Sequence, residues 1–177
     1  MKVVSAVLLS FLVSITTIFG LVTWQPSFLQ TSPAPLAEFT KLIKYPNGSC
    51  SGVVIAPTLV LTAAQCEAAA GQRMTIDGYN VRVLKKDTTR DLMVVHAPAV
   101  VCPCVQVADK QPAIGTRVFV AGYPLGVGPF FTEGLSAGPV DFEKNAGVKD
   151  LQLVSATVVG GNSGGGMFIR EWGQWKL

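Results

Sequence analysis

A serine flanked by glycines is the most specific short motif in the chain, at Gly161-Asn162-Ser163-Gly164-Gly165. In a turn after an apolar strand, such a serine can expose its hydroxyl as a nucleophile. The N–H groups around it can point into one concavity and form an oxyanion hole that stabilises a developing negative charge. The same motif also fits a glycine-rich hairpin turn without any chemical role, so the motif needs the support of other segments.

Three earlier segments supply that support. The first begins with Ser49-Cys50-Ser51-Gly52 and ends with Leu61-Thr62-Ala63-Ala64-Gln65-Cys66. The second is Asp91-Leu92-Met93-Val94-Val95, and the third joins Val120-Ala121-Gly122-Tyr123-Pro124-Leu125-Gly126 to Thr132-Glu133-Gly134-Leu135-Ser136-Ala137. Together with the serine motif they cover roughly residues 48–168. In this order they resemble the trypsin-like serine proteases, and most closely the compact bacterial HtrA-type branch.

The resemblance implies an all-β, two-barrel chymotrypsin fold that hydrolyses peptide bonds through an acyl-enzyme, without a cofactor or a metal. It makes Ser163 the nucleophile, the N–H groups of Gly161 and Ser163 the oxyanion hole, and Asp91 the carboxylate that orients the base. Thr157 would lie at the floor of the specificity pocket. Because this floor is uncharged, small or apolar substrate side chains are favoured over Lys and Arg.

Gln65 stands where the family has its general-base histidine. An amide can hydrogen-bond a serine hydroxyl but cannot accept its proton near neutral pH. Removing the base from a related triad costs on the order of a millionfold in turnover. His96, the only histidine, lies five residues beyond Asp91 on the same expected strand and cannot take over. We therefore expect hydrolysis to be severely impaired.

The C-terminal end also departs from the family. Gly173 predicts a hairpin turn, so Gln174 begins a strand that has only a few residues before Leu177. In the family this strand continues into the wall of the specificity pocket. We therefore expect a second barrel that is incomplete at this end, or completed in another way, with an unpaired sheet edge.

The N-terminal end is apolar. Residues 3–24 carry no charge and would span roughly 33 Å as a helix, enough for a bilayer core. We expect a signal anchor over residues 1–24, a proline-containing linker over 25–37 and the protease domain over 38–177. A cleaved signal peptide and a buried helix are the alternatives. The domain would thus be exported, either membrane-anchored on the periplasmic or extracellular side or secreted after cleavage.

Composition agrees with a β-rich, ordered domain. The chain has 177 residues, of which 49% are hydrophobic and 14% charged, which excludes a disordered chain. Its net charge of +3 comes without a basic block, so nucleic acid is not an expected partner. Ala63–Ala70 is the one good helical stretch. The expected strands are Phe39–Lys44, Ser51–Ile55, Thr58–Leu61, Arg73–Ile76, Val81–Lys85, Leu92–His96, Arg117–Ala121, Phe130–Glu133, Leu151–Thr157 and Gly166–Arg170.

The four cysteines form two sets. The family resemblance implies a Cys50–Cys66 disulfide, which an exported domain permits. Cys102-Pro103-Cys104 is too close in sequence for an easy internal bridge, so free, buried or strained thiols are expected. With His96 the pair could form half of a metal site, but no further ligands are evident and no metal is expected.

Two functions remain open. The first is a trypsin-like serine endopeptidase homologue that Gln65 leaves inactive or severely impaired. The second is a non-catalytic pseudoprotease that binds peptides, or a membrane partner, in the same cleft without cutting. A polypeptide substrate or ligand is the expected partner in both cases, together with the membrane through residues 3–24.

Overall fold

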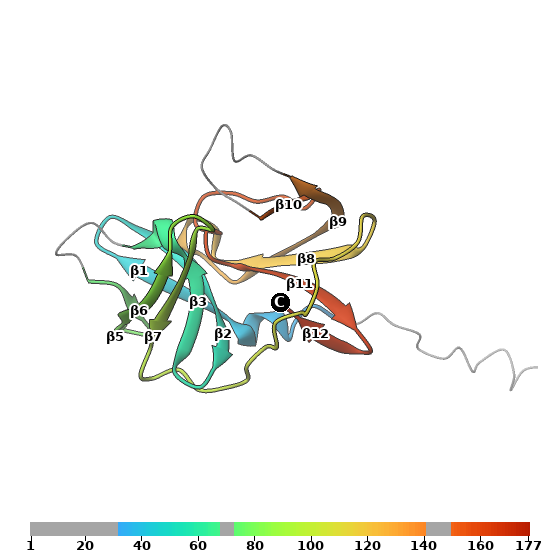
Figure 1. Ribbon diagram of the computed structural model, residues 1–177. Coiled ribbons are helices and arrows are strands. Elements are labelled where there is room, and N and C mark those ends of the chain that lie inside the picture. The colour runs from blue at the N-terminus through green and yellow to red at the C-terminus, as the bar shows by residue number, and fades with distance from the viewer. Residues whose placement is uncertain (1–31, 68–72, 141–149) are drawn as a thin grey trace, which may run out of the picture. The chain divides into compact units, whose positions relative to one another are not determined.

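The computed structural model describes residues 32–67, 73–140 and 150–177, and almost all of their regular structure is β-strand (Figure 1). Two curled antiparallel sheets follow one another along the chain. The all-β architecture expected from the regularly spaced strands is therefore confirmed. The expected anchor over residues 1–24 lies outside the described residues. Within the described ranges, no helix has the length and apolar character needed to cross a membrane.

The first sheet has seven strands in the order β5-β4-β1-β2-β3-β7-β6. Its strands are β1 Thr40–Tyr45, β2 Gly48–Ala56, β3 Leu59–Ala63, β4 Thr75–Ile76, β5 Tyr79–Asn80, β6 Arg82–Asp87 and β7 Leu92–His96. Alternate apolar residues point to one side and form the first core, in which Ile43, Val60 and Val95 are fully buried. The antiparallel pairing of β3 with β7, in which Ala63 is opposite Leu92, places Asp91, just before β7, beside the end of β3.

The second sheet has five strands in the order β10-β9-β8-β11-β12. Its strands are β8 Arg117–Gly122, β9 Phe130–Val140, β10 Leu151–Val154, β11 Gly166–Glu171 and β12 Gln174–Lys176. The last two form a hairpin through Trp172 and Gly173, as the sequence predicts. The serine motif occupies the connection between β10 and β11, so the two strands fix both of its ends.

Helical structure is limited to three single turns in the described ranges: α2 Leu36–Phe39, η1 Ala64–Cys66 and η2 Pro124–Gly126. The helix expected over Ala63–Ala70 is wrong at its start, because Ala63 ends β3 and only residues 64–66 form a turn. Residues 68–70 lie outside the described part. The alanine run favours helix locally, but pairing of β3 with its neighbours decides the conformation.

The second core lies where the two sheets pack together. It combines Leu36, Val53 of β2, Val105, Ala121 and Phe168, all at most 2% exposed. Leu36 falls inside the segment expected as a linker, but its side chain is completely buried. Leu36 belongs to the compact unit that begins at Pro33. Because Val53 belongs to the first sheet, burial of this core holds the two sheets against each other.

The C-terminal edge is hydrogen-bonded rather than open. Lys176 forms a parallel bridge with Gln106, and the Leu177 N–H donates to the Gln106 carbonyl at 2.9 Å. The Leu177 carbonyl in turn accepts the Ala108 N–H at 2.8 Å. The segment joining the two sheets thus covers the edge of β12, contrary to the unpaired edge expected from the sequence.

Both cysteine pairs are disulfides. Cys50 at β2 and Cys66 after β3 are bonded, with Cα atoms 6.0 Å apart, as the resemblance implies. Cys102 and Cys104 are also bonded to each other, with Cα atoms 4.5 Å apart. The expectation of thiols there is wrong, because the chain at Pro103 turns enough to bring the two sulfur atoms together. No group of three or more residues able to hold a metal is found in the described ranges.

Candidate active site

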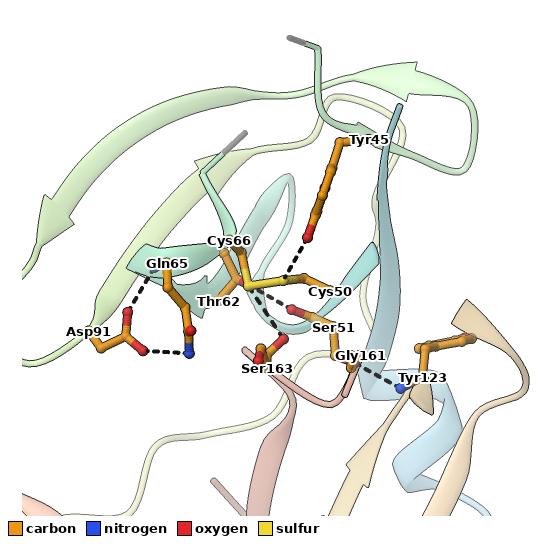
Figure 2. The surroundings of a disulfide bond; sticks show 10 residues. All are labelled: Tyr45, Cys50, Ser51, Thr62, Gln65, Cys66, Asp91, Tyr123, Gly161 and Ser163. Atoms are coloured by element: carbon orange, nitrogen blue, oxygen red, sulfur yellow. Dashed lines mark hydrogen bonds between the residues drawn. A yellow bond between two sulfur atoms is a disulfide. The ribbon is translucent and has the colours of Figure 1, made fainter. Parts of the chain in front are cut away.

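Asp91 and Gln65 are joined by two hydrogen bonds. The Gln65 backbone N–H donates to Asp91 Oδ1 at 2.8 Å, and the Gln65 side-chain Nε2 donates to Oδ2 at 3.0 Å (Figure 2). The Ala64 N–H also donates to the Asp91 carbonyl at 3.0 Å. The end of β3 and the start of β7 therefore hold both residues of the expected base–carboxylate pair in register.

The Gln65 amide has one defined orientation in this arrangement. A carboxylate only accepts hydrogen bonds, so the NH₂ group must face Asp91 and the carbonyl Oε1 must point elsewhere. That oxygen can accept a hydrogen bond from a hydroxyl but has no useful basicity. Gln65 thus binds the carboxylate through its side chain but cannot take a proton.

A short turn of charged residues positions Asp91, which adopts a left-handed φ of 53°. Asp87 Oδ1 accepts the N–H groups of Thr89 and Arg90 at 3.0 and 3.1 Å. The Arg90 guanidinium bonds Asp87 at 3.1 Å and Asp150 at 2.7 Å. The Arg90 backbone N–H, followed by its guanidinium, lowers the pKa of Asp87 below its ordinary value. This turn fixes the backbone from which the Asp91 carboxylate projects.

Ser163 lies in a turn that contacts the first sheet. Its carbonyl accepts the Ser51 N–H of β2 at 2.8 Å, and Cys66 Sγ lies 3.6 Å from the same oxygen (Figure 2). The sulfur contact is not a hydrogen bond, because a disulfide sulfur carries no hydrogen. The Cys50–Cys66 disulfide therefore forms part of the surface on which the serine turn rests.

Gly164 is required for this close approach. Its φ is +79°, and a Cβ there would lie 2.7 Å from the Ala63 N and closer still to Thr62 Oγ1 and the Ser51 carbonyl. A side chain would therefore push the serine turn away from β2 and β3. The residue after Ser163 must be glycine for steric reasons as well as for backbone conformation.

Ser51 is a positioning residue whose individual role the sequence analysis missed. Its buried hydroxyl donates to the Gly161 carbonyl at 2.8 Å and accepts the Tyr123 N–H at 2.8 Å. Its own carbonyl accepts the Thr62 hydroxyl at 2.7 Å. One side chain of the first sheet thus links the serine turn to the corner after β8. Both partners of the hydroxyl are more than 70 residues away in the sequence, so no local sequence signal marks this role.

Gly161, the expected oxyanion-hole residue, packs against the η2 turn. Its φ is +94°, and a Cβ there would lie 2.5 Å from the Leu125 N and 2.6 Å from the Tyr123 carbonyl oxygen. The Leu125 N–H donates to the Gly160 carbonyl at 2.8 Å, and Leu125 itself has a left-handed φ of 54°. The strained η2 turn therefore fixes the peptide that precedes the serine motif.

Asp91 and Gly164 line one recess between the two sheets, with a volume of about 340 Å³. Its other lining residues are Val53, Leu61, Thr62, Ala63, Leu92, Gly165, Met167 and Leu177. Most of these side chains are apolar, so the recess suits an apolar group rather than a charged one.

The other two residues singled out in the sequence lie apart from this recess. Thr157 is exposed beyond β10, and its carbonyl accepts the Thr132 hydroxyl of β9 at 2.8 Å. His96 lies at the far end of β7, opposite Leu59 and Arg82, whereas Asp91 lies just before the start of that strand. The structure therefore joins Gln65 directly to Asp91, and it joins Ser163 and Gly161 to Ser51 of β2. His96 takes no part in these contacts.

Two curled β-sheets with a glycine–serine turn, an aspartate and a disulfide at their junction define a trypsin-like peptidase fold. The family model of the trypsin-like peptidase domain matches residues 50–174, which is more than half of the chain. The chain therefore belongs to the trypsin-like peptidase family.

Solved structures agree on the fold. An inactive form of the Rv3671c protease matches with 23% identity and a TM-score of 0.66, covering 85% of this chain and 81% of that one. A serine-to-alanine variant of Rv3671c from M. tuberculosis H37Rv matches with 21% identity and a TM-score of 0.64, covering 82% and 76%. The HtrA-type protease AlgW, solved with a tripeptide, matches with 20% identity and a TM-score of 0.67, covering 78% of this chain and 50% of AlgW. No curated protein sequence matches the chain.

Proposed function

We propose that the chain is a trypsin-like serine endopeptidase homologue in which Ser163 is the nucleophile and Gln65 occupies the general-base position. The observation that carries this proposal is the pair of hydrogen bonds from Gln65 to the Asp91 carboxylate. An aspartate whose two oxygens hold the backbone and the side chain of residue 65 is arranged to orient a base at that position. With glutamine at position 65, the chain hydrolyses peptides very slowly because the Gln65 amide does not remove the proton of the Ser163 hydroxyl.

The remaining roles are proposed from the family resemblance. The N–H groups of Gly161 and Ser163 form the oxyanion hole. The Ser51 hydroxyl supports this geometry because it donates a hydrogen bond to the Gly161 carbonyl and so fixes that peptide. Thr157, which is exposed and does not line the apolar recess, is the proposed uncharged floor of a specificity pocket that prefers small or apolar side chains. The domain acts on the exported side of a membrane, anchored by residues 1–24 or released by signal cleavage, which is consistent with two disulfides.

The experiment is to replace Gln65 by histidine and to offer a mixed peptide library. We expect cleavage to rise by at least about 10²-fold and by up to about 10⁶-fold, with a preference for small or apolar residues before the cut. Gln65→His combined with Ser163→Ala is the matched control and stays at the background rate. A folded Gln65→His variant without any increase in cleavage would contradict the proposal.

Binding of a peptide without cleavage is the alternative function. It is favoured by the same geometry, since Gln65 replaces a base without disturbing the Asp91 contacts or the turn around Ser163. A photoreactive peptide library should then crosslink to residues of the apolar recess in the unmodified chain. Crosslinks distributed over the surface, with none near Asp91 or Gly164, would exclude this function.

A further inference from the structure

The disulfide between Cys102 and Cys104 lies on the segment that joins the two sheets. Val100, on one side of it, is 1% exposed and belongs to the first core, and its carbonyl accepts the Thr58 N–H at 2.9 Å. Val105, on the other side, is 2% exposed and belongs to the second core, and its N–H donates to the Val54 carbonyl at 3.0 Å. The disulfide therefore occupies a short span whose two ends are independently anchored.

The two disulfides of the chain differ in exposure and in the length of chain that they close. Cys50 and Cys66 are 4% and 1% exposed, and they are 16 residues apart. Cys102 is exposed, Cys104 is half-buried, and only Pro103 separates them. Because stabilisation by a disulfide grows with the length of the closed loop, the Cys102–Cys104 bond contributes little to the stability of the fold. An exposed disulfide with a small structural role is the kind that takes part in exchange.

Cys104 also lines a surface depression of about 660 Å³, and Ser163 is not among its lining residues. The other lining residues are Ile55, Val105, Gln106, Val107, Ala108, Asp109, Glu171 and Lys176. Lys176 bonds Gln106 across this depression, and Asp109 and Glu171 add two carboxylates. The depression is polar enough to admit a hydrated thiol reagent, which the surroundings of the buried Cys50–Cys66 pair do not.

We propose that Cys102-Pro103-Cys104 is a thiol–disulfide exchange site for a dithiol reductant. One thiolate of the reductant attacks Cys102 Sγ, the more exposed residue, and forms a mixed disulfide as the Cys102–Cys104 bond breaks. Cys104 leaves as a thiolate and takes a proton from water. The second thiol of the reductant, as its thiolate, then attacks the reductant's other sulfur atom, the one bonded to Cys102 in the mixed disulfide. This closes the reductant's disulfide and releases Cys102 as a thiolate that is protonated by water. The reductant loses two electrons, and the protein pair gains them.

This exchange requires no unfolding, because Val100 and Val105 hold the chain on both sides of the disulfide. Reduction changes the joining segment while leaving both cores and the Cys50–Cys66 bond intact. The site is separate from the proposed peptidase chemistry and uses none of its residues.

The test is selective reduction of the full chain by dithiothreitol under native conditions, followed by alkylation with iodoacetamide and peptide mass spectrometry. We expect Cys102 and Cys104 to be labelled at least about tenfold faster than Cys50 and Cys66, with an unchanged circular dichroism spectrum. Labelling of both pairs at the same rate, or of Cys102 and Cys104 only when the spectrum is lost, would overturn the proposal.

Single-cysteine variants test which sulfur is attacked. Cys104→Ser leaves the Cys102 thiol exposed, and we expect it to form a mixed disulfide with oxidised glutathione severalfold faster than Cys104 does in Cys102→Ser. The opposite order would show that the entering thiol reaches Cys104, and would overturn the assignment of Cys102 as the attacked sulfur. Both variants keep the Cys50–Cys66 bond, so the circular dichroism spectrum serves as the folding control.

Discussion

The Asp91 carboxylate binds Gln65 through both of its oxygens, one to the backbone N–H at 2.8 Å and one to the side-chain amide at 3.0 Å. A carboxylate that binds both the backbone and the side chain of residue 65 fixes the orientation of that side chain. The side chain that it orients is an amide, which has no useful basicity near neutral pH.

Asp91→Ala tests how far this contact supports the fold. The substitution removes the acceptor for two donors of Gln65, and it places alanine, which tolerates a left-handed backbone less well than aspartate, at a φ of 53°. We expect the free energy of unfolding to fall by about 1–3 kcal/mol, as for hydrogen bonds to a charged group. Urea denaturation measures it, with the exposed Asp109→Ala as a charge-matched control. An unchanged midpoint for Asp91→Ala would show that the contact does not stabilise the folded state.

Ser51→Ala tests the connection between the first sheet and the serine turn. It leaves the buried Tyr123 N–H and Gly161 carbonyl without their partner. We expect a loss of about 1–3 kcal/mol of stability, because unsatisfied buried polar groups are costly. Thermal unfolding measures the loss, and Thr88→Ala, at an exposed turn position, serves as the control. Equal midpoints for the two variants would contradict the positioning role of Ser51.

Gly164→Ala tests the close approach of the serine turn to β2 and β3. The new Cβ would overlap Thr62 Oγ1 and the Ser51 carbonyl, in addition to the strain of a positive φ. Gly115→Ala is a matched control, since its φ is +84° and a Cβ there meets nothing within 4 Å. We expect Gly115→Ala to cost about 1 kcal/mol and Gly164→Ala at least about 1 kcal/mol more. Chemical denaturation of both variants separates the clash from the strain.

Asp87 gives the turn before Asp91 a dependence on pH. Its pKa is lowered from an ordinary value of 3.8, first by the Arg90 backbone N–H and then by the Arg90 guanidinium. A depressed folded-state pKa contributes stability above the unfolded value, and that stability is lost as pH falls through the folded value. We expect Asp87→Asn to flatten the decline in stability below about pH 4. Unfolding midpoints between pH 2 and 6 measure this, and an unchanged slope would contradict the assignment.

Much of the site could be predicted from the sequence because its residues fall in compact motifs. Gln65 and Asp91 lie at the ends of strands whose apolar alternation is clear, so their proximity follows from the pairing of β3 with β7. Ser51 could not be found in this way, because its partners Gly161 and Tyr123 are distant in sequence and meet it only when the two sheets pack. Tertiary contacts of a single buried hydroxyl leave almost no local pattern.

The errors at the edges of the domain have a similar origin. The prolines around Leu36 predict a linker, but the Leu36 side chain packs in the second core beside Val53 and Phe168. The Cys102–Cys104 bond was not expected because spacing alone disfavours it, whereas the conformation at Pro103 permits it. The edge of β12 was expected to be open, and residues 106–108, from a segment with no strand pattern, cover it.

The most direct test of the central claim is the reaction of Ser163 with a serine-directed phosphonate, followed by intact mass. This readout needs no knowledge of the substrate. We predict that Gln65→His forms an adduct on Ser163 about 10²–10⁴-fold faster than the unmodified chain, and that addition of Ser163→Ala abolishes it. A folded Gln65→His variant that gains no adduct, or gains one at another residue, would contradict the assignment of Gln65 to the base position.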